Sequence, residues 1–344
     1  MSDPAALFRD RTVLVTGGTG SIGSEIVRSL LPHSPHAVRV VSRDDTKQFE
    51  LQQRHVDAPA LRLLIGDVRS RERMIRAMAG VDVVFHAAAM KHVPACEFNP
   101  FEASETNVRG AQNVVEAALD AGVDRVLGIS TDKAVDPTNV MGATKLLAER
   151  LLSAAENYKG AAKTRFASVR FGNVIGSRGS LVPLVHAQVA AGGPVTITDP
   201  EMTRYLMPVE DAVRLCFDAM ERMRGGEVFI LKMPRVRIGD LVEVLIEAYA
   251  PLFGRQPAEI ELRTIGPRPG EKHDEVLLTD DEARLARSVD GMLVVPPAAV
   301  AVGDGEPQRP VSGGRGDEPL LDRAQIRELL DQAGWLSPGA RRPA

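Results

Sequence analysis

Short apolar runs alternate with longer amphipathic segments through the first half of the chain. The apolar runs are rich in β-branched residues and have the length of buried strands; they span residues 12–15, 38–41, 61–65, 81–86, 125–129 and 164–170. Other segments carry apolar residues at helical spacing, at residues 21–31, 72–79, 107–121 and 139–158. This alternation predicts an α/β fold: a Rossmann-type doubly wound parallel sheet with helices on both faces.

The pattern changes after Phe171, where loop-rich sequence begins. Two more helical patterns and one candidate edge strand follow, at residues 208–223, 238–250 and 259–265. We therefore divide the chain into four parts. They are a Rossmann domain, a region that is mainly a smaller C-terminal substrate-binding lobe, a flexible linker rich in Gly, Pro, Asp and Arg, and a C-terminal helix and tail, at residues 8–175, 176–296, 297–320 and 321–344.

The amino-acid composition argues against several classes of function. The 344 residues are 44% hydrophobic, which is enough for a large core, and the formal net charge is −4. Because there is no basic face or tail, we expect no nucleic-acid partner. We find no secretory leader pattern and no apolar run long enough to span a bilayer, so we expect no membrane association and a cytoplasmic protein. The two cysteines form no Cys/His cluster, so we expect no metal site.

A glycine-rich turn lies between the first predicted strand and the first predicted helix. Its glycines recur every third residue, which is a variant of the dinucleotide-binding pattern. Such a turn lets a pyrophosphate approach the N–H groups at a helix N-terminus, where the helix dipole favours an anion. We assign dinucleotide binding to Gly17, Thr19, Gly20, Ser21, Ile22 and Gly23.

The end of the second strand favours NADP(H) as the cofactor. NAD-binding proteins usually place a carboxylate there, whereas this strand ends at Ser42 and Arg43, with Lys47 one helical turn later. A hydroxyl and two cations suit a 2′-phosphate, although Asp44 and Asp45 reduce the local positive charge. We expect further cofactor contacts where the third and fourth strands end, at Asp67, Val68, Ala87, Ala88 and Ala89.

Two stretches lie near the carboxyl end of the fifth strand. Residues 130–134 read Ser-Thr-Asp-Lys-Ala, and residues 141–145 open a helix. The second stretch resembles the extended short-chain dehydrogenase/reductases, whose catalytic helix carries Tyr-x-x-x-Lys. Lys145 matches the lysine of that motif, which implies a contact with the nicotinamide ribose. Met141 occupies the tyrosine position, and because a thioether cannot titrate, the usual phenolic base is missing.

Asp132 and Lys133 offer an alternative acid and base. Ligands of doubly wound sheets bind at the carboxyl ends of the strands, where this pair lies. To act as a base near neutral pH, the lysine needs a pKa that burial has lowered. The competing interpretation is an exposed Asp–Lys pair in a loop.

Further strings of residues narrow the family; they are residues 87–94, 130–134, 171–174, 196–204 and 268–272. Together they resemble the bacterial UDP-N-acetylglucosamine 4,6-dehydratases, which belong to the polysaccharide biosynthesis branch of the extended short-chain dehydrogenase/reductases. The resemblance covers about residues 8–278. It implies a hydro-lyase that uses NADP and acts on a UDP-N-acetylhexosamine. Hydride leaves sugar C4, the C5 proton and the C6 hydroxyl depart as water, and hydride returns to C6.

The resemblance also implies roles for individual residues. Lys133 is the C5 base, Asp132 is the acid for the C6 hydroxyl, and Thr131 forms a hydrogen bond near C4. The group that deprotonates the C4 hydroxyl is left open, because we expect Tyr205, the tyrosine nearest an expected substrate segment, to have a packing role. Further cofactor contacts fall to Lys91, Ser130, Lys145 and Val174. Substrate contacts fall to Lys91, Asn173, Gln188, Thr198, Arg204, Arg268 and Glu271.

Two other functions compete with dehydration. A nucleotide-sugar 4-epimerase would use the same cofactor and oxidise the same carbon, but such an enzyme usually needs the tyrosine that Met141 replaces. A catalytically silent NADP(H)-binding regulator would have no use for the intact Asp132–Lys133 pair. We expect a homo-oligomer, and the sequence leaves open the configuration of the product at C5.

Overall fold

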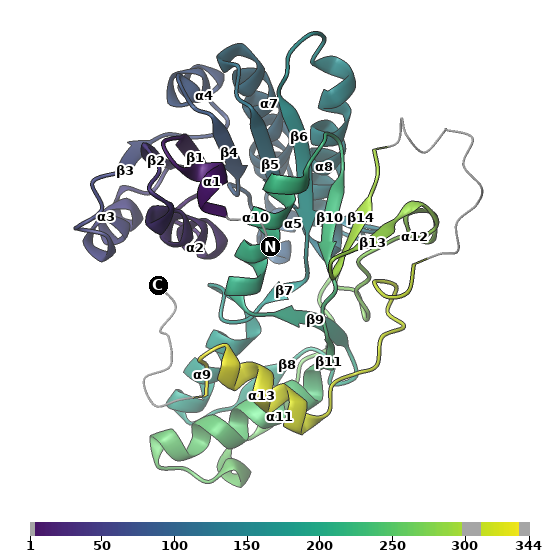
Figure 1. Cartoon of the computed structure of the whole chain (residues 1–344). Coiled ribbons are helices and arrows are strands. Elements are labelled where there is room, and N and C mark those ends of the chain that lie inside the picture. The colour runs from purple at the N-terminus through teal and green to yellow at the C-terminus, as the bar shows by residue number, and fades with distance from the viewer. Residues whose placement is uncertain (1–3, 298–310, 337–344) are drawn as a thin grey trace.

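The computed structural model describes residues 4–297 and 311–336. In Figure 1, a large sheet flanked by helices forms the upper part of the molecule. A smaller lobe lies below it, built around α9 (Leu181–Ala191), α11 (Ile238–Tyr249) and α13 (Arg323–Gln332). The predicted fold class, an α/β protein with a doubly wound parallel sheet and a smaller lobe, is confirmed.

The main sheet has nine strands within the described chain, in the order β13-β14-β10-β6-β5-β4-β1-β2-β3. Strands β1 to β6 and β10 run parallel, whereas β14 and β13 are added antiparallel at one edge. The order 3-2-1-4-5-6 within it is that of a dinucleotide-binding Rossmann fold. The parallel strands are β1 (Thr12–Thr16), β2 (Ala37–Ser42), β3 (Leu61–Ile65), β4 (Val83–His86), β5 (Arg125–Ile129), β6 (Arg165–Arg170) and β10 (Val228–Leu231).

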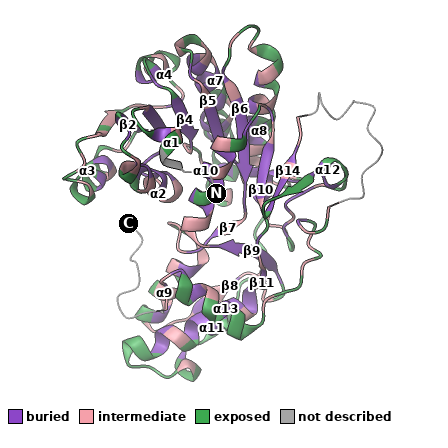
Figure 2. Cartoon of the chain, viewed as in Figure 1, coloured by how far each residue is buried: buried purple, intermediate pink, exposed green. Residues whose placement is uncertain are grey.

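Helices cover both faces of this sheet. One face packs against α2 (Ser21–Leu30) and α10 (Val209–Arg222), and the other against α4 (Arg71–Met78), α7 (Gly110–Ala121) and α8 (Val140–Tyr158). Strand β1 contributes to the apolar cores on both faces, because its side chains alternate. Val13 and Val15 pack in the core beneath α2 and α10, and Leu14 packs in the core beneath α4 and α7. The central strands are therefore buried on both sides, as Figure 2 shows, which explains why they read as continuous apolar runs.

Local sequence explains where α8 begins. Asn139 has extended backbone and caps α8, with its side-chain oxygen accepting a hydrogen bond from the Gly142 N–H at 2.8 Å. The predicted helix at residues 107–121 is α7 preceded by a π-helical turn, Glu105–Arg109. The sequence analysis did not predict the remaining short helices of this half, which are α1 (Pro4–Phe8), α3 (Asp45–Arg54), α5 (Val93–Phe98) and α6 (Pro100–Ser104).

The lower lobe has its own core and two small sheets. Helices α9, α11 and α13 enclose a cluster of buried apolar side chains that includes Val185, Leu241 and Leu330. The predicted edge strand at residues 259–265 is the shorter β12, which pairs with β8 in parallel. The strands are β7 (Asn173–Val174), β9 (Thr203–Met207) and β11 (Arg235–Arg237) in one sheet, and β8 (Val195–Ile197) and β12 (Leu262–Thr264) in the other.

The chain returns to the main sheet after entering the lower lobe. Strand β10 and the antiparallel pair β13 (Arg287–Val289) and β14 (Met292–Val295) extend that sheet, and α12 (Asp280–Leu285) packs beside β14. Region 176–296 is thus shared between the lobe and the sheet. Of the predicted linker at 297–320, residues 298–310 lie outside the described residues. In its described part, Gly314 accepts backbone hydrogen bonds from Leu277 and Leu278.

Candidate active site

A cleft of about 690 Å³ opens at the carboxyl ends of β1, β4 and β5. It brings together most of the predicted cofactor and catalytic residues, although they come from distant parts of the sequence. The predicted residues that line it are Thr19, Gly20, Ser21, Ile22, Gly23, Arg43, Lys47, Ala87, Ala89, Lys91, Ser130, Thr131, Lys133, Met141, Lys145, Asn173 and Val174.

The glycine turn at one end of the cleft leaves no room for side chains. Gly17 has a positive φ of 67°, and a Cβ there would lie 2.7 Å from the Ala88 backbone. A Cβ at Gly23 would lie 2.3 Å from the Gly17 carbonyl oxygen. The bare backbone before α2 therefore fits the pyrophosphate of a nicotinamide dinucleotide, which would bind against the N–H groups of the turn and the start of α2.

The end of the cleft beside β2 carries the two predicted cations. Lys47 lies 2.7 Å from Asp44, and Arg43, with a side chain 57% exposed, lies 3.7 Å from Asp67. Ser42 accepts a hydrogen bond from Gln48 at 3.0 Å. Predicted contacts Val68 and Ala88 lie behind the lining, where Val68 packs against Gly110 and Ala88 against the glycine turn. Both cations have acidic neighbours, but their exposure leaves them able to turn toward a phosphate.

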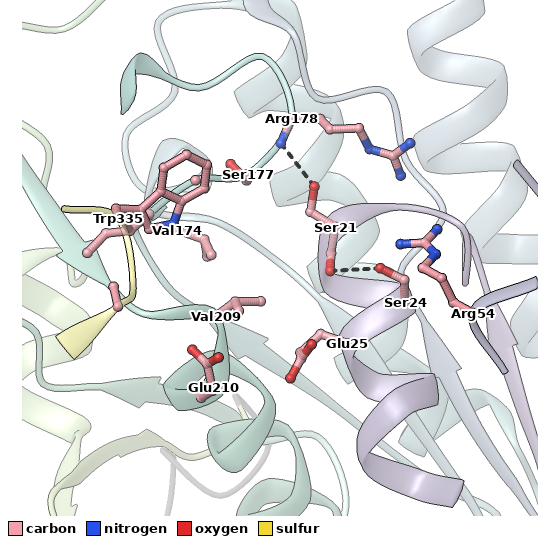
Figure 3. Close-up of a pocket in the computed structure, with 13 residues that line it drawn as sticks. Ser21, Ser24, Glu25, Arg54, Val174, Ser177, Arg178, Val209, Glu210 and Trp335 are labelled. Atoms are coloured by element: carbon pink, nitrogen blue, oxygen red, sulfur yellow. Dashed lines mark hydrogen bonds between the residues drawn. The ribbon is translucent and has the colours of Figure 1, made fainter. Parts of the chain in front are cut away.

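One residue that the sequence analysis missed closes over the glycine turn. The backbone N–H of Arg178 donates to the Ser21 hydroxyl at 3.0 Å (Figure 3). The Arg178 guanidinium donates to the Thr19 carbonyl. Its own carbonyl accepts from Lys91 at 2.8 Å. Burial, with a smaller effect from the charge of Arg178, lowers the pKa of Lys91. Figure 3 also places Trp335, from the C-terminal segment, beside Val174 and Ser177 on this loop.

Thr131, Asp132 and Lys133 form a connected group at the other end of the cleft. The Thr131 hydroxyl donates to Asp132 Oδ1 at 2.8 Å, and Lys133 Nζ lies 3.0 Å from the same oxygen. Lys133 Nζ also donates to Asn173 Oδ1 at 3.2 Å. Asp132 is fully buried and the Lys133 side chain is 22% exposed. The competing interpretation of a solvated loop pair is therefore wrong.

The backbone explains why this group is rigid. The Asp132 N–H donates to the Phe171 carbonyl at 3.0 Å, which ties the short 3₁₀ turn after β5 to the strand end that carries Asn173. A Cβ at Gly142 would lie 2.2 Å from the Lys133 carbonyl oxygen, so only glycine allows the start of α8 to lie against the turn. Two neighbouring strand ends and one helix thus position the amine of Lys133.

The expected direction of the Lys133 pKa is wrong. Burial alone lowers the pKa of this amine, but the negative charges of Asp132 and Glu275 outweigh burial and raise the pKa above its ordinary value. The Glu275 carboxylate, 3% exposed, lies 3.4 Å from Lys133 Nζ. Glu275 could not be predicted as a neighbour of Lys133, because it lies 142 positions farther along the chain. Lys133 is therefore an ammonium at rest, and it lies between the carboxylates of Asp132 and Glu275.

Lys145 and Met141 both line the cleft, as expected from the family's Tyr-x-x-x-Lys motif. Lys145 Nζ donates to the Ile129 carbonyl, and burial lowers its pKa to about 8, against a smaller opposite effect of Glu149. Met141 is buried and lines the cleft where the family's tyrosine would stand. The buried hydroxyl of Ser130 has no hydrogen-bond partner among the described residues, so it is available to a ligand.

No tyrosine replaces the missing phenol within the described chain. Tyr205 donates its hydroxyl proton to Glu318 at 2.7 Å, and burial, with that carboxylate, raises its pKa. Tyr249 donates to the Trp335 carbonyl in the lower lobe. Tyr158 is exposed at the end of α8. The expected packing role of Tyr205 therefore agrees with its contacts.

The predicted substrate residues of the lower lobe divide into two groups. Arg204 Nη2 lies 3.3 Å from Glu271 Oε1, and Thr198 lies 3.5 Å from the same oxygen. Arg204 also donates to the carbonyls of Thr203, Lys272 and His273, so it organises the turn at residues 268–274. Arg268 is exposed in that turn. Gln188 instead pairs with Thr196 and is not among the residues that line the cleft.

A buried asparagine that was not predicted, Asn107, connects two segments that line the cleft. Asn107 bonds both the N–H and the carbonyl of Met90 and donates to Thr144 of α8. It thereby ties the loop after β4, which carries Lys91, to the catalytic helix. Nothing in the sequence singled out Asn107, because residues 104–106 beside it are also polar. Among the described residues, no cluster of His, Cys, Asp or Glu is arranged to hold a metal ion, and no helix has the length and apolar character needed to cross a bilayer.

The fold and the site define an extended short-chain dehydrogenase/reductase. The lysine of the catalytic helix, the glycine turn and the strand-end residues all face one cleft, although methionine replaces the phenol. Residues 13–297 match the family described as "Polysaccharide biosynthesis protein", and the chain belongs to this family. The predicted resemblance to the UDP-N-acetylglucosamine 4,6-dehydratases is confirmed.

Individual relatives carry different names. The chain is 50% identical to an "Uncharacterized membrane protein" of Methanocaldococcus jannaschii, over 97% of this chain and 99% of that one. It is 42% identical to the inverting UDP-N-acetylglucosamine 4,6-dehydratase of Campylobacter jejuni, over 85% and 84% of the two chains. A UDP-glucose 4-epimerase of Rickettsia felis is also 42% identical, over 84% of each. The solved structure of Pen from Bacillus thuringiensis superimposes with a TM-score of 0.91 at 42% identity, covering 96% and 99%.

Proposed function

We propose that this protein is an NADP-dependent UDP-N-acetylglucosamine 4,6-dehydratase that produces a UDP-2-acetamido-2,6-dideoxy-4-hexulose. The observation that carries the proposal is the hydrogen-bonded group of Thr131, Asp132 and Lys133 in a cleft whose phenol position is Met141. Water loss needs an acid and a base at adjacent carbons, and this group supplies both. The predicted homo-oligomer remains a prediction.

The residues suggest how protons move. When bound, the nicotinamide supplies reversible hydride acceptance. A proton leaving the C4 hydroxyl can pass to Thr131 while the Thr131 proton passes to Asp132, because that hydrogen bond is already formed at 2.8 Å. This relay is our proposal for how the C4 hydroxyl loses its proton in the absence of a phenol. It also leaves Asp132 protonated, which is the state needed to protonate the departing C6 hydroxyl. Lys133 then removes the C5 proton.

The substrate class rests on two arguments. The dehydratase of Campylobacter jejuni, to which this chain is similar over most of its length, is named for UDP-N-acetylglucosamine. The turn at residues 268–274 carries Arg268 exposed and Glu271 part-buried, which suits a diphosphate and a ribose hydroxyl, respectively. We assign the 2′-phosphate of NADP to Arg43 and Lys47 on the same reasoning from charge.

A UDP-sugar 4-epimerase is the second candidate, because relatives at the same identity carry that name. Epimerisation returns hydride to C4 from the opposite face and needs no base at C5. An epimerase would therefore not need Lys133 as a base, and the buried contacts that position this amine would have no role in its reaction.

Purified protein incubated with UDP-N-acetylglucosamine in deuterated water tests the proposal. We expect a product lighter by one water, with deuterium incorporated at C5, measured by mass spectrometry and NMR. A parallel incubation with UDP-glucose tests the second candidate. Unchanged mass with inverted C4 in either reaction would replace dehydration by epimerisation. Cofactor binding without turnover of either sugar would favour a silent regulator.

A further inference from the structure

Glu275 lies against the catalytic lysine but has no role in the chemistry described so far. It follows the turn at residues 268–274, and one carboxylate oxygen lies 3.4 Å from Lys133 Nζ. Its other oxygen, Oε2, is buried and has no hydrogen-bond partner among the described residues. The nearest cation to Oε2 is Lys272, at 3.6 Å, and that amine donates to the Val135 carbonyl instead.

This contact creates a difficulty for Lys133 as a base. A lysine can remove a carbon-bound proton only as a neutral amine. The charges of Asp132 and Glu275, however, raise the Lys133 pKa against the effect of burial, so the resting amine is an ammonium. Its proton must leave before the C5 step, and the acceptor must lie within reach of Nζ.

Asp132 cannot be that acceptor at the right moment. In the proposed relay it already carries the proton from the C4 hydroxyl, and it must keep that proton for the C6 hydroxyl. The remaining polar neighbour of Nζ, Asn173, presents an amide oxygen that does not hold a proton near neutral pH. Among the described groups bonded or ion-paired to Nζ, only Glu275 remains.

We infer that Glu275 is a positioning residue that accepts the Lys133 proton within the cleft and thereby makes the amine a base. The inference rests on the proposed function. One N–H bond of the ammonium breaks and one O–H bond forms, so Lys133 becomes a neutral amine and Glu275 a neutral carboxylic acid. Lys133 then takes the C5 proton and becomes an ammonium again. When C5 is reprotonated from Lys133, Glu275 returns its proton and both groups recover their starting charge.

The surroundings favour this exchange once substrate excludes water. Desolvation disfavours charge on both partners, so a neutral amine and carboxylic acid become comparable in energy with the ion pair. Protonation of Asp132 removes one of the two anions that stabilise the ammonium. The charge of Arg204 acts in the same direction, because it lowers the Lys133 pKa, while Lys272 faces the opposite oxygen of Glu275.

The pH–rate profile of Glu275→Gln tests this inference. In the wild-type protein the proton moves inside the cleft, so we expect C5 deuterium exchange to be nearly independent of pH between about 7 and 9. Glutamine keeps the shape but cannot accept the proton. We expect exchange to fall roughly 100-fold at pH 7 and to rise about tenfold per pH unit, because Lys133 must then lose its proton to solvent.

Three comparisons make the result interpretable. Glu275→Asp keeps a proton acceptor and should restore part of the rate with the flat profile. The exposed Glu261→Gln of the same lobe should match wild type. Cofactor affinity and the thermal midpoint of Glu275→Gln should stay near wild type. A wild-type rate and profile in Glu275→Gln overturns the inference, as does an equal loss at every pH together with weakened cofactor binding, which would mark a purely structural residue.

A second measurement separates this inference from the proposed function. ¹⁵N-detected NMR of the lysine side chains follows Lys133 without any turnover, with Lys133→Met used for assignment. Lys133 should titrate at lower pH in Glu275→Gln than in wild type, because one stabilising anion is gone. Identical titration in both proteins refutes the coupling even if dehydration is observed. A clear shift supports the coupling even if the wild-type protein transforms a different sugar.

Discussion

The two ends of the cleft are built in different ways. The cofactor end is mostly local: the glycine turn, the start of α2 and the end of β2 lie within residues 12–47, although Ala88 and Arg178 from distant segments contact the turn. The reaction end is assembled from three distant segments, which supply Lys133, Asn173 and Glu275. Bare backbone and the helix dipole suffice to bind a phosphate. An acid and a base must instead be placed within hydrogen-bond distance of each other, and this requires tertiary structure.

Because the two ends differ in this way, we expect substitutions at one end to change cofactor binding and substitutions at the other end to change the reaction rate. Backbone changes in the glycine turn should weaken cofactor binding and leave the proton-transfer group intact. Side-chain changes at residues 131–133 should stop water loss while cofactor still binds.

The largest effect is expected for Lys133→Ala. The substitution removes the amine that is bonded to both Asp132 and Asn173 and that we propose as the C5 base, so turnover should fall by roughly 10²- to 10⁴-fold. Cofactor affinity, measured by fluorescence titration, should remain within a few-fold of wild type. Lys163→Ala, an exposed lysine before β6, is the matched control. Wild-type turnover in Lys133→Ala would remove the basis for assigning the base to this residue.

The opposite result is expected for Gly23→Ala. The added Cβ would lie 2.3 Å from the Gly17 carbonyl oxygen, so the turn must shift. Crowding of this kind costs about 1–3 kcal/mol, which corresponds to roughly a 5- to 150-fold weaker affinity for cofactor. Gly254→Ala, where space is open around a positive φ of 70°, should lower stability without changing affinity. Equal affinities for wild type and Gly23→Ala would mean that the turn is not the pyrophosphate site.

The same difference explains what the sequence could predict. Strands β1 to β6 and helices α2, α4, α7 and α8 follow apolar runs and periodicities that lie within short windows, and their bounds agree with the structure to within a few residues. The cofactor turn was predictable for the same reason. In the lower lobe, β7, β8 and β11 are only two or three residues long, too short to show a period, and they and β9 form because distant segments pair.

The missed site residues show the same limit. Nothing near Glu275 in the sequence indicates that it meets Lys133, because the contact depends on the path of the chain through the lower lobe. The raised pKa of Lys133 was missed for the same reason, since burial was foreseeable and the second carboxylate was not. Arg178 lies in a loop whose position depends on its contacts with Thr19, Ser21 and Lys91.

Cofactor selectivity offers a sharper test of the cofactor end itself. Arg43 lies at the predicted 2′-phosphate position, so Arg43→Ala should weaken NADP(H) by about tenfold, near 1.4 kcal/mol, and change NAD(H) much less. Arg178→Ala removes a contact to the glycine turn, which both cofactors share, and should weaken both about equally. Isothermal titration with each cofactor measures the two ratios. A similar loss of both cofactors in Arg43→Ala would contradict the assignment of NADP.

Lys145 links the two ends, and its charge should give the smallest effect. Its pKa is lowered to about 8, so the ammonium is mostly present at pH 7 and mostly lost at pH 9. If the charged form holds the nicotinamide ribose, cofactor affinity should fall a few-fold as pH rises through about 8. Lys145→Met should bind cofactor more weakly than wild type at pH 7, and its affinity should not change as pH rises through about 8. A step of the same size in both proteins would assign the titration to another group. No step in the wild type would mean that the neutral amine binds the ribose equally well, and that Lys145 contributes position rather than charge.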